Sequence, residues 1–155
     1  MNAPDPSTLK GKRDRAILAL LISCGLRRAE LVGLEVDWIQ QREGRWVIPD
    51  LVGKGNRLRT VTIPAAVKVR IDSWTRAAKI NEGKLFRPVN KGDRLAGDEI
   101  ADEKVIWQVV VHCARTTSLG KLAPHDLRRY AEWKTMPNLV VVTAKVKLGP
   151  ENGSA

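Results

Sequence analysis

Residues 9–33 read LKGKRDRAILALLISCGLRRAELVG, and this stretch indicates the fold most clearly. Its apolar residues are dense enough to predict a helix over residues 9–24 with a broad buried face. The residues on that face are Ile17, Leu18, Leu20, Leu21 and Ile22. Gly25 favours a stop there, because glycine readily adopts the positive φ that ends many helices. A second, short helix is predicted over residues 28–33.

The segment before the first helix, residues 1–8 (MNAPDPST), contains two prolines and no apolar period. We therefore expect a flexible lead-in, with Ser7 or Thr8 placed to cap the helix that follows.

The sequence after the second helix changes to a β-strand pattern. Residues 45–48 (RWVI) and 58–63 (LRTVTI) favour strands, the second with clear alternation of apolar and polar residues. The intervening segment 53–56 (GKGN) is typical of a hairpin turn. These residues therefore predict a β-hairpin.

Helices dominate the prediction for the rest of the chain. We expect helices from Pro64 to about residue 79, over 102–115 and from Pro124, a short edge element at Leu85–Phe86, an exposed loop over 90–99, and a strand over 139–148. This order predicts an α+β fold, a mainly helical domain with a small antiparallel β-sheet at one edge.

The composition indicates a folded chain that binds a polyanion. Its 155 residues are 43% hydrophobic and carry a formal net charge of +10, which excludes wholesale disorder. Aromatic residues make up only 5%, too few for a cradle that stacks single-stranded bases. The positive charge suits phosphate backbones or anionic membrane surfaces. No apolar stretch approaches the ~20 residues of a membrane span, so we expect no membrane partner.

The two cysteines, Cys24 and Cys113, are too few for a disulfide framework and lack a CxxC spacing. We expect both to be reduced and buried in a cytoplasmic protein. His112 and Cys113 could be proposed as metal ligands together with His125, but a tetrahedral site needs more ligands at suitable spacing. We predict no metal and no cofactor.

Two segments outside the hairpin carry candidate phosphate-binding side chains. His125 and Arg128 stand three residues apart on one predicted helix face, which can grip a phosphate or can be an ordinary solvated face. Arg27 follows the break at Gly25, with Glu30 three residues on to orient it. The alternative for Arg27 is a surface ion pair, which contributes ~0–1 kcal/mol.

The predicted hairpin carries three further cations. Lys54 at the glycine-flanked tip can reach into a DNA groove or protonate a leaving alkoxide, or it can simply keep the turn soluble. Arg57 and Arg59 would add contacts to backbone phosphates, or they are solvated charges on a strand edge.

Taken together, three segments resemble the catalytic domain of tyrosine recombinases, the phage integrase family. They are 25–31 (GLRRAEL), 53–57 (GKGNR) and 125–129 (HDLRR), in this order, and the resemblance covers roughly residues 9–130. It implies a phosphoryl-transfer site that needs no metal and acts on double-stranded DNA in integration and recombination.

The resemblance also assigns a role to each matching residue. Arg27 and Arg128 would hold the scissile phosphate and stabilise charge in the transition state. Lys54 would be the general acid for the leaving 5′ oxygen, and His125 would assist proton transfer. In the family a tyrosine attacks the phosphate and forms a 3′-phosphotyrosyl link.

The end of the sequence departs from the family pattern. Family members carry a Leu-Gly-His-like segment and, about nine residues later, the nucleophilic tyrosine; here Leu148-Gly149-Pro150 is the nearest equivalent. The single tyrosine, Tyr130, stands two residues after Arg128, so its ring would point about 200° away and pack in the core. We therefore expect no nucleophile, and a truncated, frameshifted integrase.

We thus predict a flexible lead-in over 1–8, an integrase-like catalytic domain over 9–135 and an atypical tail over 136–155. Its expected function is to bind DNA without cutting it alone. The DNA-binding residues would be Arg27, Lys54, Arg57, Arg59 and Arg128, with other recombinase protomers as further partners. Two alternatives stay open. One is an enzyme that complements a full-length recombinase or uses water as nucleophile, and the other is a non-enzymatic interaction or regulatory fragment.

Overall fold

The computed structural model describes residues 4–52 and 54–116, and this part of the chain has an α+β fold. Its elements in chain order are α1 (Leu9–Cys24), α2 (Arg28–Gly33), the 3-10 turn η1 (Val36–Trp38), β1 (Gln40–Arg42), β2 (Arg45–Val52), the 3-10 turn η2 (Lys54–Asn56), β3 (Leu58–Ile63), α3 (Ala65–Ala78) and α4 (Lys104–Thr116). The predicted helices over 9–24 and 28–33 are confirmed.

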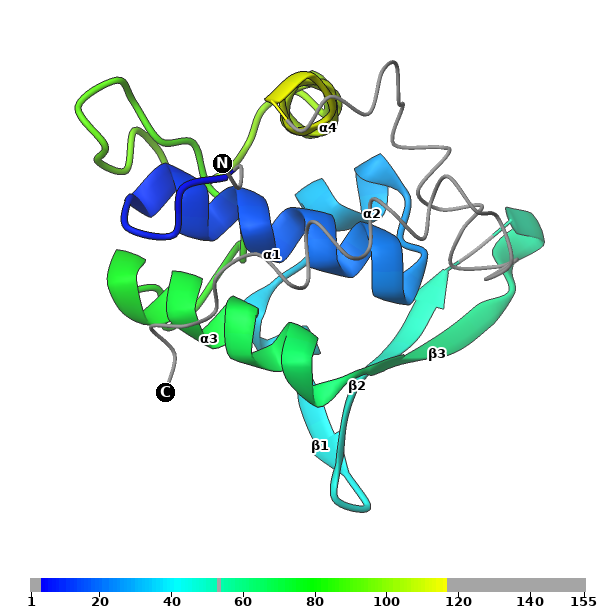
Figure 1. The fold of residues 1–155 in the computed structure, drawn as a ribbon. Helices are drawn as coiled ribbons and strands as arrows, with labels where there is room; N and C mark the ends of the chain where they lie inside the picture. The colour runs from blue at the N-terminus through cyan, green and yellow to red at the C-terminus, as the bar shows by residue number, and fades with distance from the viewer. Residues whose placement is uncertain (1–3, 53, 117–155) are drawn as a thin grey trace.

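Helix α1 is the centre of the molecule. Figure 1 shows α3 along one side of α1, α4 on another side, and the sheet at one end. Every residue from Ala16 to Ile22 is at most 1% exposed, so the helix is buried all round and not only on one face. Ile71 and Trp74 of α3 and Ile106 and Val110 of α4 complete the apolar core.

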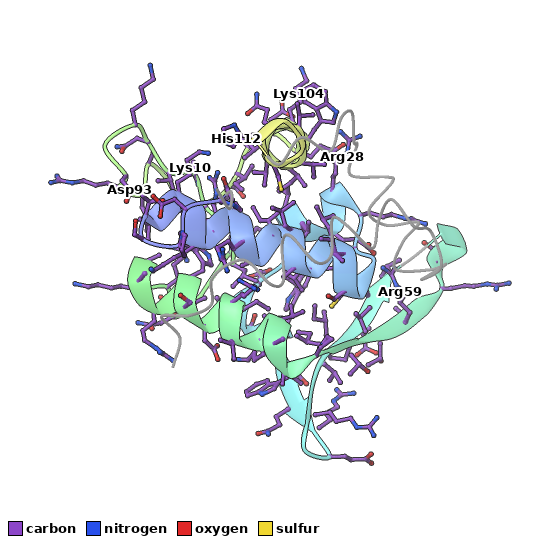
Figure 2. All side chains as sticks on the ribbon, viewed as in Figure 1. Lys10, Arg28, Arg59, Asp93, Lys104 and His112 are labelled. Atoms are coloured by element: carbon purple, nitrogen blue, oxygen red, sulfur yellow. The ribbon has the colours of Figure 1, made fainter. Side chains whose placement is uncertain are left out.

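The start of α1 is held by two side chains that accept hydrogen bonds from its amides. Thr8 is the N-cap, and its Oγ1 accepts the Gly11 N–H at 2.9 Å, as the sequence predicts. Asp93, from the loop before α4, accepts the Leu9 and Lys10 N–H groups at 2.8 and 3.0 Å. Figure 2 shows Asp93 beside Lys10. A residue distant in sequence thus satisfies helix amides that would otherwise lack partners.

The second half of the predicted flexible lead-in makes specific hydrogen bonds. The Ser7 N–H donates to Asp5 Oδ1 at 2.9 Å, and the Thr8 N–H donates to the Asp5 carbonyl. This turn lies so close to α1 that a Cβ on Gly11 would be 1.6 Å from the Asp5 carbonyl oxygen. Residues 5–8 are therefore a structured turn, because the short side chain of Asp5 organises the backbone locally.

The sheet has three antiparallel strands in the order β1-β2-β3, one more than the predicted hairpin. Strand β1 consists of Gln40, Gln41 and Arg42, all exposed, so no apolar alternation signals it. Strand β2 is longer than predicted because a bulge at Pro49–Asp50 lets it continue. Ile48 pairs with Val61 and Leu51 pairs with Arg59, which leaves one extra residue on β2.

Helices α3 and α4 confirm the predicted helices, with each end within two residues of its expected position. The short edge element predicted at Leu85–Phe86 forms no strand, and the neighbouring Lys84 makes an isolated antiparallel bridge to Glu35. Both residues of the predicted element are fully buried in a core segment between α3 and α4. The Leu85 N–H donates to the Leu34 carbonyl, and Trp74 Nε1 donates to the Leu85 carbonyl at 2.8 Å.

Three sequence predictions lie outside the described residues: the helix from Pro124, the strand over 139–148 and the domain boundary near 135. Within residues 4–52 and 54–116, no helix is both long and apolar enough to cross a membrane.

Candidate functional site

Arg27 is held at the start of α2 by its own backbone. Gly25 adopts a left-handed conformation (φ 66°) after α1, and the next residue, Leu26, is fully buried. Arg27 is then the N-cap of α2, with its carbonyl accepting the Leu31 N–H at 3.0 Å. The backbone of Arg27 is therefore held in place, and its side chain is half-buried.

Glu30 joins Arg27 to the sheet. Its Oε1 accepts the Arg27 backbone N–H at 2.7 Å. The same carboxylate accepts two hydrogen bonds from Arg59 on β3, at 2.8 Å from Nη1 and 2.9 Å from Nη2. This is a two-pronged ion pair of the strong, planar kind, and the Glu30 side chain is only 11% exposed.

The surroundings of Glu30 favour its charged form. Burial by itself would raise the pKa of the Glu30 carboxyl. The hydrogen bonds from Arg59 and from the Arg27 amide, with the positive charges of both arginines, outweigh burial and hold this pKa below its usual value. The carboxylate is therefore ionised at neutral pH.

The Arg59 side chain forms an ion pair that neither expectation for it included. Both terminal nitrogens of its guanidinium donate to Glu30, so Arg59 is not a freely solvated strand-edge charge, while the expected DNA contact stays a prediction. The sequence signalled the face that Arg59 occupies, although not its partner. Strand alternation puts Arg59 on the same face as Val61 and Ile63, the face that packs on the core. Glu30 accepts the Arg27 backbone N–H, and its ion-pair partner is Arg59.

The tip between β2 and β3 is a tight, exposed turn. Gly55 and Asn56 both adopt positive φ, 74° and 59°, which these residue types tolerate. Figure 1 shows this tip at the end of the long β2–β3 ribbon, away from α1. Arg57 is exposed beside it, so the tip presents a cation to solvent. The backbone of Lys54 belongs to η2, and its side chain lies outside the described part of the chain.

The remaining predicted site residues, His125 and Arg128, lie outside the described residues, as does Tyr130. In the described part no three His, Cys, Asp or Glu side chains are grouped as metal ligands.

The two cysteines differ in burial. Cys113 is buried as predicted, and burial, with the nearby Asp14 carboxylate, raises the pKa of its thiol to about 11. This thiol is therefore protonated at neutral pH. The prediction that Cys24 is buried is wrong, because this residue ends α1 and is only partly covered.

Comparisons with known proteins agree on one family. The phage integrase family model matches residues 1–134. The chain is 31% identical over 134 residues to the tyrosine recombinase XerD of Pseudomonas putida, which covers 83% of this chain and 42% of that protein. It is 35% identical over 122 residues to XerC of Pseudomonas aeruginosa, covering 76% of this chain and 36% of that protein. It thus spans about two fifths of the length of these relatives.

Solved structures show the same fold. The XerH site-specific recombinase, in a pre-cleavage complex with its difH substrate, aligns with a TM-score of 0.61 at 19% identity, covering 90% of this chain and 40% of that one. The XerA recombinase aligns with a TM-score of 0.60 at 17% identity, covering 88% of this chain and 48% of that one.

Proposed function

The chain belongs to the phage integrase family, and on this basis we propose that residues 9–135 bind duplex DNA as the catalytic-domain region of a site-specific tyrosine recombinase. The XerH recombinase, which has the same fold, is bound to its difH substrate, and this supports DNA as the ligand class. The net charge of +10 fits a phosphate backbone.

The observation that carries this proposal is the fixed position of Arg27 in a fold that also presents an exposed cationic hairpin. Arg27 lies at a helix start whose geometry is set by Gly25 and Glu30. Arg57 beside the hairpin tip is exposed to solvent, as a side chain that contacts phosphate must be. A backbone phosphate needs such donors at fixed positions, because phosphate contacts set register and orientation on the duplex.

The proposed chemistry divides between four side chains of this chain and a tyrosine. Arg27 and Arg128 bind the scissile phosphate and neutralise the charge that develops on its oxygens. A tyrosine oxygen forms the new bond to phosphorus while the bond to the 5′ oxygen breaks. Lys54 gives its proton to that 5′ oxygen, and His125 assists proton transfer.

The sequence lacks a tyrosine at the spacing that the family uses for its nucleophile. Its one tyrosine, Tyr130, stands two residues after Arg128, where the helix that the sequence predicts from Pro124 would direct it away from the phosphate. We therefore propose that these 155 residues hold DNA without cutting it, and that cleavage requires a tyrosine from outside them. A nicked duplex that traps covalent adducts tests this. An adduct that forms with the parent chain and is lost in Tyr130→Phe would contradict it.

DNA binding is tested by its salt dependence. Anisotropy of a labelled duplex, measured over about 50–300 mM salt, should show affinity falling steeply, with a log–log slope of about −0.9 per phosphate contact. We expect Arg27→Ala and Arg57→Ala each to reduce the slope by about one contact.

Arg42→Ala is the matched control for these two variants. Arg42 is an exposed arginine in β1, away from the hairpin tip, and its substitution removes the same charge. Equal slopes for Arg27→Ala, Arg57→Ala and Arg42→Ala would show that binding follows net charge and not this site.

A further inference from the structure

We infer that Arg59 is a positioning residue, which couples the β2–β3 hairpin to Arg27 through Glu30 and does not itself contact DNA. This inference rests on the proposed function and deepens it. It replaces the sequence-based expectation that Arg59 contributes a phosphate contact of its own.

Arg59 lies on the less exposed face of β3. Along β3 the exposed residues Leu58, Thr60 and Thr62 alternate with the less exposed Arg59, Val61 and Ile63. Arg59 therefore lies on the core-facing side of β3, nearer to the hairpin tip than Val61 and Ile63. Its side chain is 32% exposed, whereas Arg57 lies on the exposed part of the hairpin.

The bulge in β2 puts an apolar residue opposite Arg59. The extra residue at Pro49–Asp50 shifts the register so that Leu51, and not the exposed Asp50, pairs with Arg59. Leu51 is only 6% exposed. Arg59 thus extends from a shielded position, and its guanidinium meets the carboxylate of Glu30 in α2.

The Glu30 carboxylate connects the start of α2, at Arg27, with β3, at Arg59. Oε1 accepts both the Arg27 backbone N–H at 2.7 Å and Arg59 Nη2 at 2.9 Å, and Oε2 accepts Arg59 Nη1 at 2.8 Å. The position of Arg27 and the position of β3 are therefore not independent. Because β3 leads directly from the hairpin tip, this connection sets where the tip cations lie relative to Arg27.

A two-pronged phosphate contact by Arg59 conflicts with this geometry. For the fork of Nη1 and Nη2 to bind a phosphate it would have to leave Glu30, and a carboxylate that is 11% exposed would lose its charged partner. Leaving a poorly solvated charge without its partner is costly. A lysine cannot replace the arginine here, because one ammonium cannot reproduce the planar two-pronged contact.

The first arm of the test uses the free protein. In Arg59→Lys and Arg59→Ala we expect hydrogen exchange at the Arg27 amide to accelerate about tenfold, since its acceptor is no longer held. Amides in the middle of α1 report global unfolding in the same spectra, and exchange at Arg27 is compared with them. Arg57→Ala, which alters an exposed neighbour, should leave the Arg27 amide unchanged. Unchanged exchange at Arg27 in both Arg59 variants would overturn the inference.

The second arm is a double-mutant cycle on duplex affinity. Arg59→Lys keeps the charge, so we expect an unchanged salt slope but affinity several-fold weaker than the parent chain. In the Arg27→Ala background the same substitution should have little further effect, because Arg59 acts through Arg27. If instead Arg59→Lys retains full affinity and Arg59→Ala lowers the slope additively with Arg27→Ala, Arg59 is a phosphate contact and the inference is wrong.

The two arms separate failure of the inference from failure of the proposed function. If the unaltered chain shows no salt-dependent binding to duplex DNA, the proposed function fails. The exchange measurement at Arg27 then decides by itself whether Arg59 positions that residue.

Discussion

Among single residues, Glu30 has the most consequences for the site. Its lowered pKa means that the ionised carboxylate stabilises the fold above its ordinary pKa of 4.5, and that this stabilisation is lost as pH falls through the lower folded value. The reason is that protonation removes the charge that binds Arg59 and weakens acceptance of the Arg27 N–H.

We therefore predict that Glu30→Gln lowers the free energy of unfolding by about 1–2 kcal/mol at pH 7, the lower part of the range for charged hydrogen bonds. Urea titrations at pH 7 and at about pH 3 measure the difference between the two proteins. The difference should shrink at the acidic pH, because the stabilisation by the parent carboxylate is lost as pH falls through its lowered pKa. A difference of equal size at both pH values would contradict the assigned charge.

Among the elements, α1 and α3 end in the same way with different residues. Gly25 after α1 has φ 66°, and Lys79 after α3 has φ 57°. The left-handed conformation costs a residue with a Cβ roughly 1–2 kcal/mol, and glycine avoids this cost. Helix α3 therefore ends at a strained position that its hydrogen bonds to Thr75 and Arg76 maintain.

Lys79→Gly should accordingly stabilise the protein, by about 1 kcal/mol, and Gly25→Ala should destabilise it by a similar amount. Both changes are measured as shifts of the urea midpoint at constant m-value. Lys68→Gly, inside α3, serves as the comparison. We expect it to lower the stability of the protein, since glycine in a helix interior destabilises. A loss of stability in Lys79→Gly would mean that the lysine side chain contributes more than its backbone strain costs.

Across the whole molecule, the fold depends on one buried helix. Helix α1 contacts α3, α4 and β3, so a cavity in α1 affects all the layers that position the site. We predict that Leu21→Ala, at a fully buried position, costs about 2–5 kcal/mol. This is a large part of the ~5–15 kcal/mol that stabilises a typical domain.

Val69→Ala on α3 is the control for Leu21→Ala, because its side chain is 57% exposed and should change stability by less than about 0.5 kcal/mol. Fluorescence of the tryptophans, including buried Trp74, follows both unfolding transitions. Equal effects of the two substitutions would be incompatible with α1 as the centre of the core.

Local signals in the amino-acid sequence are sufficient to predict several helices and strands and to indicate the family. The apolar run over 17–22, the glycine at 25 and the alternation over 58–63 each act within a few residues, through helix and strand periodicity and backbone preference. The order and spacing of GLRRAEL and GKGNR likewise indicate the family, which the match of the family model to residues 1–134 confirms.

Contacts between distant segments, in contrast, depend on the tertiary fold. Arg59 binds Glu30 across 29 residues, and Asp93 caps α1 across 84 and 83 residues. Strand β1 forms from three exposed polar residues because β2 offers it a free edge. Burial of Leu85 and Phe86 depends on α1, α3 and α4 closing around them. No local pattern encodes such partners, because their free energy exists only once the chain has brought the segments together.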